Sequence, residues 1–262
     1  MIENGLFDER INKLDDHAAS SSLLFELFIA ALFAFHIDVS DSSIPRKKRI
    51  VKLDKALKKL FPHAKIELRY RTPWQLLVAV ELSAQCTDKM VNKITERLFK
   101  KYKTLDAYIR AGKSIKGVRE FEADIKSSGF YRNKTKNILG AAKIIKQKFN
   151  GRVPNTMQEL LTFPGVARKT ANIVLSETYG VIAGIAVDTH VIRFVRRFSL
   201  SDYHDPKRIE LDLMELLPKK EWPHFTHRVI HYGRYLAPAR KYDISKDPLI
   251  KIYPPAATKF RV

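Results

Sequence analysis

The chain has 262 residues, of which 45% are hydrophobic and 29% are charged, enough to bury one large or two small cores and unlike a disordered or fibrous protein. A formal net charge of +20 points to a polyanionic partner, which is either a nucleic acid or an anionic membrane. The chain contains one cysteine, Cys86, which excludes an intrachain disulfide or a cage of several thiolates and fits a reducing compartment.

Residues 1–45 differ from the rest of the chain. They carry eight acidic and two basic side chains, a net charge of −6, so the remaining residues carry +26. The apolar run 23–37 is shorter than the roughly 20 residues that span a bilayer, and it follows an acidic start that does not suit a signal peptide. We therefore expect an extension here, disordered or an added helix, with no membrane anchor, and a basic body that binds nucleic acid.

From residue 46 onward the pattern is helical. Thr72-Pro-Trp-Gln75 is typical of a helix start, because threonine caps, proline suits the first turn and glutamine reaches back to the cap. The helix that follows, over 74–84, is apolar on nearly every face, which indicates a central buried helix. Thr87 and Asp88 can cap the next helix, and further helices are expected over 133–148, from Asp205 onward and over 221–235. No run alternates with period two, so the sequence predicts an all-α fold.

A helix-hairpin-helix arrangement is predicted over 157–178. A capping box, Thr156-Met-Gln-Glu159, starts a short helix that stops at Phe163-Pro-Gly-Val166, because proline lacks an N–H and glycine allows a positive φ. A second helix begins at about Ala167. The hairpin N–H groups and the positive helix end suit a DNA phosphate and do not read base edges. The residues expected to contact DNA in this way are Gly165, Val166, Ala167 and Arg168.

Lys169 and Asp188 are the candidate catalytic residues. A helix N-terminus and a neighbouring cation both disfavour the ammonium form of a lysine, and a neutral amine can attack a sugar C1′ to form a Schiff base. A carboxylate at Asp188 can stabilise a cationic sugar and shuttle protons. The alternative interpretations are a phosphate-binding surface lysine and an ordinary helix cap, respectively.

Short motifs follow one another along residues 60–241: Leu82-Ser-Ala-Gln-Cys-Thr-Asp88, Gly129-Phe-Tyr-Arg-Asn-Lys134, Phe163-Pro-Gly-Val-Ala-Arg-Lys-Thr-Ala-Asn172, Ala186-Val-Asp-Thr-His190 and His231-Tyr-Gly-Arg-Tyr235. In this order they resemble the endonuclease III family of bifunctional DNA glycosylase/AP lyases. The resemblance implies two helical domains with a DNA-binding cleft between them. One is a six-helix barrel over 66–183, and the other combines 46–65 with 184–262.

The resemblance also implies roles for individual residues. It puts the Schiff-base lysine at Lys169 and the catalytic aspartate at Asp188. The glutamine that fills the gap left by a flipped nucleotide falls on Gln85, and the apolar wedge beside it falls on Phe130. His190, which ends its motif, is expected among the DNA contacts. The implied activity is excision of damaged bases, oxidised pyrimidines above all, and nicking at abasic sites by a cytoplasmic, nucleoid-associated monomer acting on double-stranded DNA.

Three features depart from the family pattern. Many relatives hold a four-iron, four-sulfur cluster with four cysteines, which fall here on about Ala237, Ile244, Asp247 and Tyr253, so we expect no cluster and no other cofactor or metal. Ala167 stands where the family often has a second hairpin glycine. Glu81 interrupts an otherwise apolar helix and has no role that the sequence assigns.

Three other interpretations compete with this one. An adenine-mismatch glycosylase would lack the lysine and carry a catalytic glutamate at position 79 or 80, where this chain has Ala79 and Val80 next to Glu81. A non-enzymatic helix-hairpin-helix module would need the hairpin but neither Lys169 nor Asp188. A protein of anionic membranes would depend on the apolar run 23–37 alone.

Overall fold

The computed structural model describes residues 44–240 and 242–258. These residues form eleven α-helices, α2 to α12, joined by turns and short 3-10 or π-helical segments, and they contain no β-strand. The expectation of an all-α fold is confirmed. The apolar run 23–37 and the rest of the acidic extension up to residue 43 lie outside the described residues. No helix within 44–240 or 242–258 has both the length and the apolar character needed to cross a membrane.

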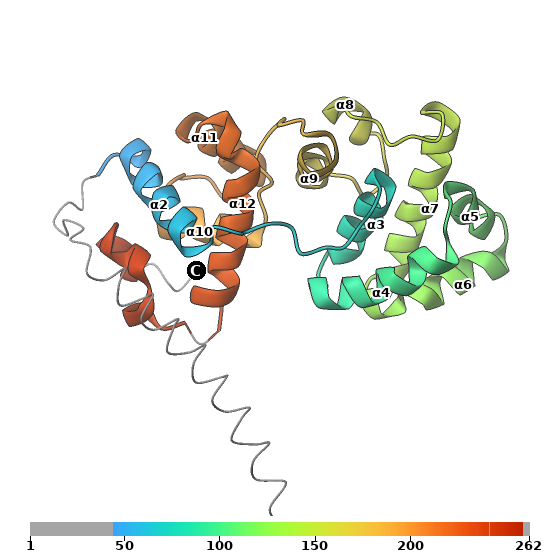
Figure 1. Ribbon diagram of the computed structural model, residues 1–262, viewed down its shortest axis with the longest axis horizontal. Coiled ribbons are helices and arrows are strands. Elements are labelled where there is room, and N and C mark those ends of the chain that lie inside the picture. Colours follow the sequence, from blue (N-terminus) through green and yellow to red (C-terminus); the bar gives the residue numbers. More distant parts are fainter. Residues whose placement is uncertain (1–43, 241, 259–262) are drawn as a thin grey trace, which may run out of the picture.

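The helices divide into two groups that lie side by side (Figure 1). One group contains α2 (Arg46–Leu60), α10 (Thr189–Arg197), α11 (Pro206–Leu216) and α12 (Trp222–His231). The other contains α3 (Pro73–Ser83), α4 (Asp88–Lys101), α5 (Leu105–Ala111), α6 (Ile115–Ile125), α7 (Tyr131–Lys148), α8 (Met157–Leu160) and α9 (Arg168–Tyr179). The chain crosses from α2 to α3 and returns between α9 and α10, so the first helix packs with the last ones.

The buried apolar side chains form two separate cores. The first lobe, as we use the term, is built around a core drawn from residues 68–175, and the second lobe around a core drawn from 50–57 and 185–256. In the first, α3 is the central helix, with Leu76 and Leu82 fully buried. Truncating such a leucine to alanine typically costs about 2–5 kcal/mol. The two cores show that the described chain packs as two separate bodies.

Most helices in the described chain begin at a side-chain cap. The predicted caps Thr72, Thr156 and Asp188 are confirmed: each accepts a hydrogen bond from the backbone N–H three residues on. Thr87, Thr104, Ser114 and Asp205 do the same for α4, α5, α6 and α11. Two of the helices without a side-chain cap are α7, which follows Phe130, and α9, which follows Ala167. Both uncapped starts fall on residues expected to face DNA.

Two boundaries differ from the sequence expectation. Ala167 is the N-cap residue of α9 and adopts an extended conformation, so the helix itself starts at Arg168. The last long helix stops at His231 and continues as a π-helical turn, Tyr232–Leu236. The wider turn leaves carbonyls free of their usual partners, and the Arg193 side chain donates to two of them, Gly233 O at 3.1 Å and Ala237 O at 2.8 Å.

Candidate active site and nucleic-acid interface

The hairpin between α8 and α9 is tight and needs its glycine. Gly165 has φ +79°, and a Cβ at this position would lie 2.4 Å from Asn137 Nδ2 and 2.8 Å from Glu81 Oε1. Both the backbone angle and the space beneath it therefore exclude a larger residue. Val166, assigned to DNA contact from the sequence, has a buried side chain, and its N–H donates to Phe163 O at 3.2 Å. The exposed residues of the turn are Gly165 and Ala167.

Glu81, for which no role was predicted, lies directly under this hairpin. Its Oε1 accepts a hydrogen bond from Asn137 Nδ2 at 2.7 Å, which joins α3 to α7. Burial raises the pKa of Glu81, while the Asn137 hydrogen bond and the charge of Lys134 oppose the shift. The pair forms the floor against which Gly165 packs. Nothing in the spacing of the sequence could have found it, because the two residues lie 56 positions apart.

The start of α9 presents Lys169 to solvent. Ala167 offers no side-chain acceptor, so the first-turn N–H groups of this helix carry no side-chain cap. Lys169 is exposed in that first turn. Arg168 differs from its expected role as a DNA contact: its Nε and Nη2 each donate to one carboxylate oxygen of buried Glu210 at 2.8 Å. Its charge is therefore balanced by the second lobe, since α11 supplies Glu210.

Asp188 lies at the start of α10, in the second lobe. Its Oδ1 accepts the Val191 N–H at 2.9 Å, and the residue is half-buried. The capping interpretation is therefore correct for one carboxylate oxygen. Capping holds the side chain in one orientation and leaves the second oxygen for other work, so the cap and the catalytic interpretation are compatible.

His190 connects the two candidate catalytic groups electrostatically. Burial lowers the pKa of His190 below its usual 6.5, and the charge of Asp188 raises it. The cations that lower it further are Arg193, Arg234 and Lys169. Lys169 from the first lobe and Asp188 from the second thus act on the same imidazole, which is predominantly neutral near pH 7. Its Nδ1 is buried and has no hydrogen-bond partner among the described residues.

His190 packs against Gly233 of the π-helical turn. A Cβ at Gly233 would lie 2.3 Å from His190 Nδ1 and 3.2 Å from its Cγ, so only glycine allows this approach. The motifs Ala186–His190 and His231–Tyr235, more than 40 positions apart, therefore meet at this contact. His190 is thus a half-buried packing residue of the second lobe beside the candidate active site.

Gln85 and Phe130 share an unusual conformation. Both are exposed, and both have left-handed backbone angles, φ +54° at Gln85 and φ +47° at Phe130. Such angles cost a residue other than glycine roughly 1–2 kcal/mol. Phe130 is 63% exposed, a large fraction for an aromatic ring. The sequence predicted both as DNA contacts, and the structure places them as solvent-facing residues at the ends of two tight turns.

A polar seam joins the lobes near these residues. Arg234 in the π-helical turn pairs with Asp88 Oδ2 at 2.6 Å, at the start of α4, and with Glu67 Oε2 at 2.7 Å. His227 on α12 contacts Glu177 Oε1 on α9 at 2.8 Å. These pairs tie the second lobe to the first and fix the position of Asp188 relative to Lys169.

The C-terminal segment is held by a buried polar cluster. Asp247 accepts hydrogen bonds from the hydroxyls of Tyr232 and Tyr242, each at 2.5 Å, and its Oδ2 lies 3.8 Å from Arg197 Nη2. Arg197 also donates to both tyrosine hydroxyls and lies over the Tyr242 ring. Asp247 and Arg197 are both 3% exposed. We call this group of four the Arg197 cluster.

The positions that correspond to iron–sulfur ligands do not fit such a cluster. Ala237 and Ile244 have no donor atom, Asp247 is committed to the Arg197 cluster, and the Tyr253 ring lies under the Arg49 guanidinium at 3.9 Å. The thiolates that bind iron–sulfur groups are absent from this region, and Cys86 belongs to the first lobe.

Comparison with known proteins agrees with this arrangement. Residues 78–219 match the family described as HhH-GPD superfamily base excision DNA repair protein. The chain is 49% identical over 196 residues to endonuclease III of Synechocystis sp., covering 75% of this chain and 87% of the relative. This chain belongs to the endonuclease III family. It is a base excision DNA repair protein of the DNA glycosylase/AP lyase class.

Two solved endonuclease III structures share the architecture. A non-covalent endonuclease III–DNA complex has a TM-score of 0.77 and 42% identity, covering 84% of this chain and all of the other. A trapped endonuclease III–DNA covalent intermediate, an estranged-adenine complex, has a TM-score of 0.76 and 41% identity over 83% of this chain and all of the other.

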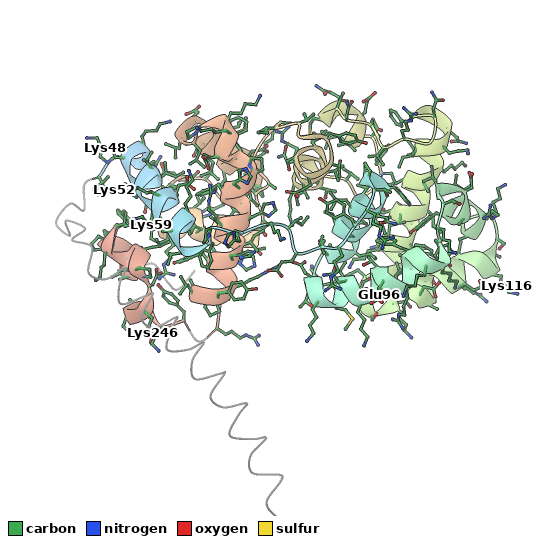
Figure 2. The ribbon with its side chains drawn as sticks, viewed as in Figure 1. Lys48, Lys52, Lys59, Glu96, Lys116 and Lys246 are labelled. Atoms are coloured by element: carbon green, nitrogen blue, oxygen red, sulfur yellow. The ribbon has the colours of Figure 1, made fainter. Side chains whose placement is uncertain are left out.

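The basic surface extends beyond the candidate site. Lys48 and Lys52 on α2 and Lys116 on α6 lie at opposite ends of the molecule (Figure 2). All three are exposed, so they add to the long-range field that attracts a polyanion without facing the hairpin.

Proposed function

We propose that Lys169 is the nucleophile and Asp188 the assisting carboxylate of a DNA glycosylase/AP lyase, one group from each lobe. The observation that carries this assignment is the placement of the two groups, with Lys169 in the exposed first turn of α9 and Asp188 held at the start of α10 by the Val191 N–H. Exposure of Lys169 in the first turn of an uncapped helix makes its amine accessible to a sugar.

The reaction follows from these two groups. The neutral Lys169 amine attacks C1′, the bond from C1′ to the base breaks, and the base leaves with a proton. The Asp188 carboxylate stabilises the cationic sugar and accepts the proton that the nitrogen loses. It returns this proton to O4′ as the C1′–O4′ bond breaks, so the sugar ring opens and the Schiff base forms. Loss of the C2′ proton then breaks the C3′–O bond, and water releases the lysine. The expected substrates are oxidised pyrimidines and abasic sites.

We propose that double-stranded DNA is bound mainly through phosphates. The exposed turn residues Gly165 and Ala167 and the uncapped start of α9 supply N–H donors of the kind that bind phosphate. Gln85 fills the gap left by the flipped nucleotide, and Phe130 stacks on the unstacked bases beside it. In keeping with this mode, two structurally similar endonuclease III proteins were solved with DNA.

No iron–sulfur cluster is needed in this assignment. The single cysteine of the chain and the commitment of Asp247 to the Arg197 cluster support its absence. Purified protein should therefore be colourless, and stoichiometric iron with activity lost on its removal would contradict this. A monomer acting on nucleoid DNA in the cytoplasm stays a prediction from the sequence.

Duplexes that carry one defined lesion test the function. Wild-type protein should release an oxidised pyrimidine and nick the strand at that position, and it should also nick a preformed abasic site. Lys169→Gln should abolish nicking of both while DNA affinity stays within about threefold, because Lys169 is one of 48 lysine and arginine residues in the chain. Release of adenine from a mismatch without nicking would support the monofunctional alternative instead.

A further inference from the structure

Lys134, near the start of α7, holds three carbonyl groups with one ammonium. The residue is 3% exposed, and its Nζ donates to Leu82 O, Ala84 O and Ser128 O, each at 2.8 Å. No carboxylate of the described residues lies within ion-pairing distance of it. A buried cation without a counter-ion is costly to keep, so its position calls for an explanation.

The three carbonyls belong to the two turns that end in Gln85 and Phe130. Leu82 and Ala84 lie at the C-terminal end of α3, immediately before Gln85. Ser128 ends the 3-10 turn that precedes Gly129 and Phe130. One side chain therefore joins the backbone directly upstream of both exposed left-handed residues.

A lysine suits this position for a physical reason. The last carbonyls of a helix have no partner within the helix, and a cation stabilises them. An ammonium has three donors on one atom, which matches three carbonyls that converge on one point. The bonds fix the spacing between two turns that lie about 45 positions apart in the chain and would otherwise move independently.

We propose that Lys134 is a positioning residue that fixes Gln85 and Phe130 as one rigid wedge for insertion into the DNA duplex. The proposal rests on the function assigned above, in which these two residues enter the space of the flipped nucleotide. Lys134 itself does not touch DNA, because its side chain is buried. Its hydrogen bonds hold the two strained turns at a fixed separation.

A fluorescence measurement tests insertion without any chemistry. The probe is a duplex with a stable tetrahydrofuran abasic analogue placed opposite 2-aminopurine, whose emission rises when it is unstacked. Binding of wild-type protein should raise the emission. Lys134→Met should still bind the duplex but lose most of that rise, as Gln85→Ala should. The variant with both Lys134→Met and Gln85→Ala should lose little more of the emission rise than either single variant, because both changes remove the same insertion.

Thr135→Val is the matched control. Thr135 is the next residue of α7, is 2% exposed, and its Oγ1 has no hydrogen-bond partner among the described residues. Valine has nearly the same shape, so the same helix is altered without touching either turn. Its emission rise should equal that of wild-type protein. If Lys134→Met does not fold, Lys134→Arg, which retains the charge, replaces it in these measurements.

Kinetics separate positioning from simple loss of folded protein. With a lesion in a matched duplex, Lys134→Met should reduce the single-turnover rate by roughly 10- to 100-fold, the usual cost of a misplaced group. With the same lesion in an unpaired bubble, where no wedge is needed, the rate should fall much less. An equal loss on both substrates, or a wild-type emission rise in the Lys134 variants, would overturn the proposal. Failure of the Lys169 chemistry would leave the emission result unchanged, so the two assignments fail separately.

Discussion

The two lobes bury charge in different ways. Among the described residues, the buried charged side chains of the second lobe are Arg49, Asp54, Arg197, Glu210, Arg228 and Asp247, whereas the first lobe buries only Lys134. In the second lobe most of these groups pair with each other, as Arg228 does with Asp54 at 2.8 Å and Arg197 with Asp247. In the first lobe the single ammonium meets carbonyls alone.

The difference follows from what each lobe must hold in place. The first lobe has a closed apolar core around α3 and, among the described residues, no buried ion pair. Its one buried charged side chain, Lys134, donates to the backbone of two exposed turns. The second lobe gathers an N-terminal helix, three later helices and a C-terminal segment without long regular structure. Buried ion pairs fix irregular segments in one arrangement, although they add little net stability. Buried charge thus holds two exposed turns in the first lobe and the fold itself in the second.

Asp188 belongs to the second lobe, and Asp188→Asn tests its proposed part in the chemistry. The variant keeps an oxygen for the Val191 N–H and therefore the start of α10, but it loses the negative charge. Base excision should fall by about 10²–10⁴-fold, the usual contribution of a positioned acid or base. Nicking of a preformed abasic site should fall less, because the sugar aldehyde is already reactive. Equal loss on both substrates would show that Asp188 matters only for folding.

The Arg197 cluster should matter for stability and not for chemistry. Asp247→Asn leaves the Arg197 charge buried without its carboxylate, which should reduce the free energy of unfolding by about 3–5 kcal/mol in urea denaturation. Activity per folded molecule should stay unchanged. The control is Asp243→Asn, an exposed carboxylate in the same segment, which should leave the free energy of unfolding unchanged. If Asp247→Asn lost specific activity while keeping normal stability, the Arg197 cluster would have a part in the chemistry, contrary to this prediction.

Two histidines make the free energy of unfolding depend on pH. Burial lowers the pKa of both His190 and His231 from 6.5. Below that pH the unfolded chain binds protons that the folded chain does not, so the free energy of unfolding falls as pH drops, by up to about 1.4 kcal/mol per pH unit for each histidine. Between pH 7.5 and 5.5 the free energy of unfolding of His231→Gln should change less with pH than that of wild-type protein. Identical slopes in thermal or urea denaturation would contradict this origin.

The local features of the site could be predicted from sequence, and the long-range ones could not. Thr72 and Asp188 follow from short-range rules of helix capping, and the hairpin at Gly165 follows from the chemistry of proline and glycine. These rules depend on neighbours within a few positions. The all-α fold follows from periodicity in the same way.

The missed contacts join residues far apart in the chain. Lys134 lies in the helix predicted over 133–148, whose pattern indicates no partner for it, yet it bonds to carbonyls up to 52 positions away. Arg168 was expected to contact DNA as part of the hairpin, and no pattern in the sequence indicated that its side chain makes a bidentate contact with Glu210 of the second lobe. Spacing contains no information about such pairs, because packing of two helices decides them.

The identity of the nucleophile is the central claim, and covalent trapping tests it most directly. A borohydride reductant present during turnover on an abasic duplex reduces the Schiff base, so protein and DNA become joined through the attacking nitrogen. Peptide mapping by mass spectrometry should then place the sugar remnant on Lys169, and Lys169→Gln should give no crosslink while it still binds the duplex. A remnant on another lysine, or trapping of Lys169→Gln at the wild-type yield, would contradict the assignment.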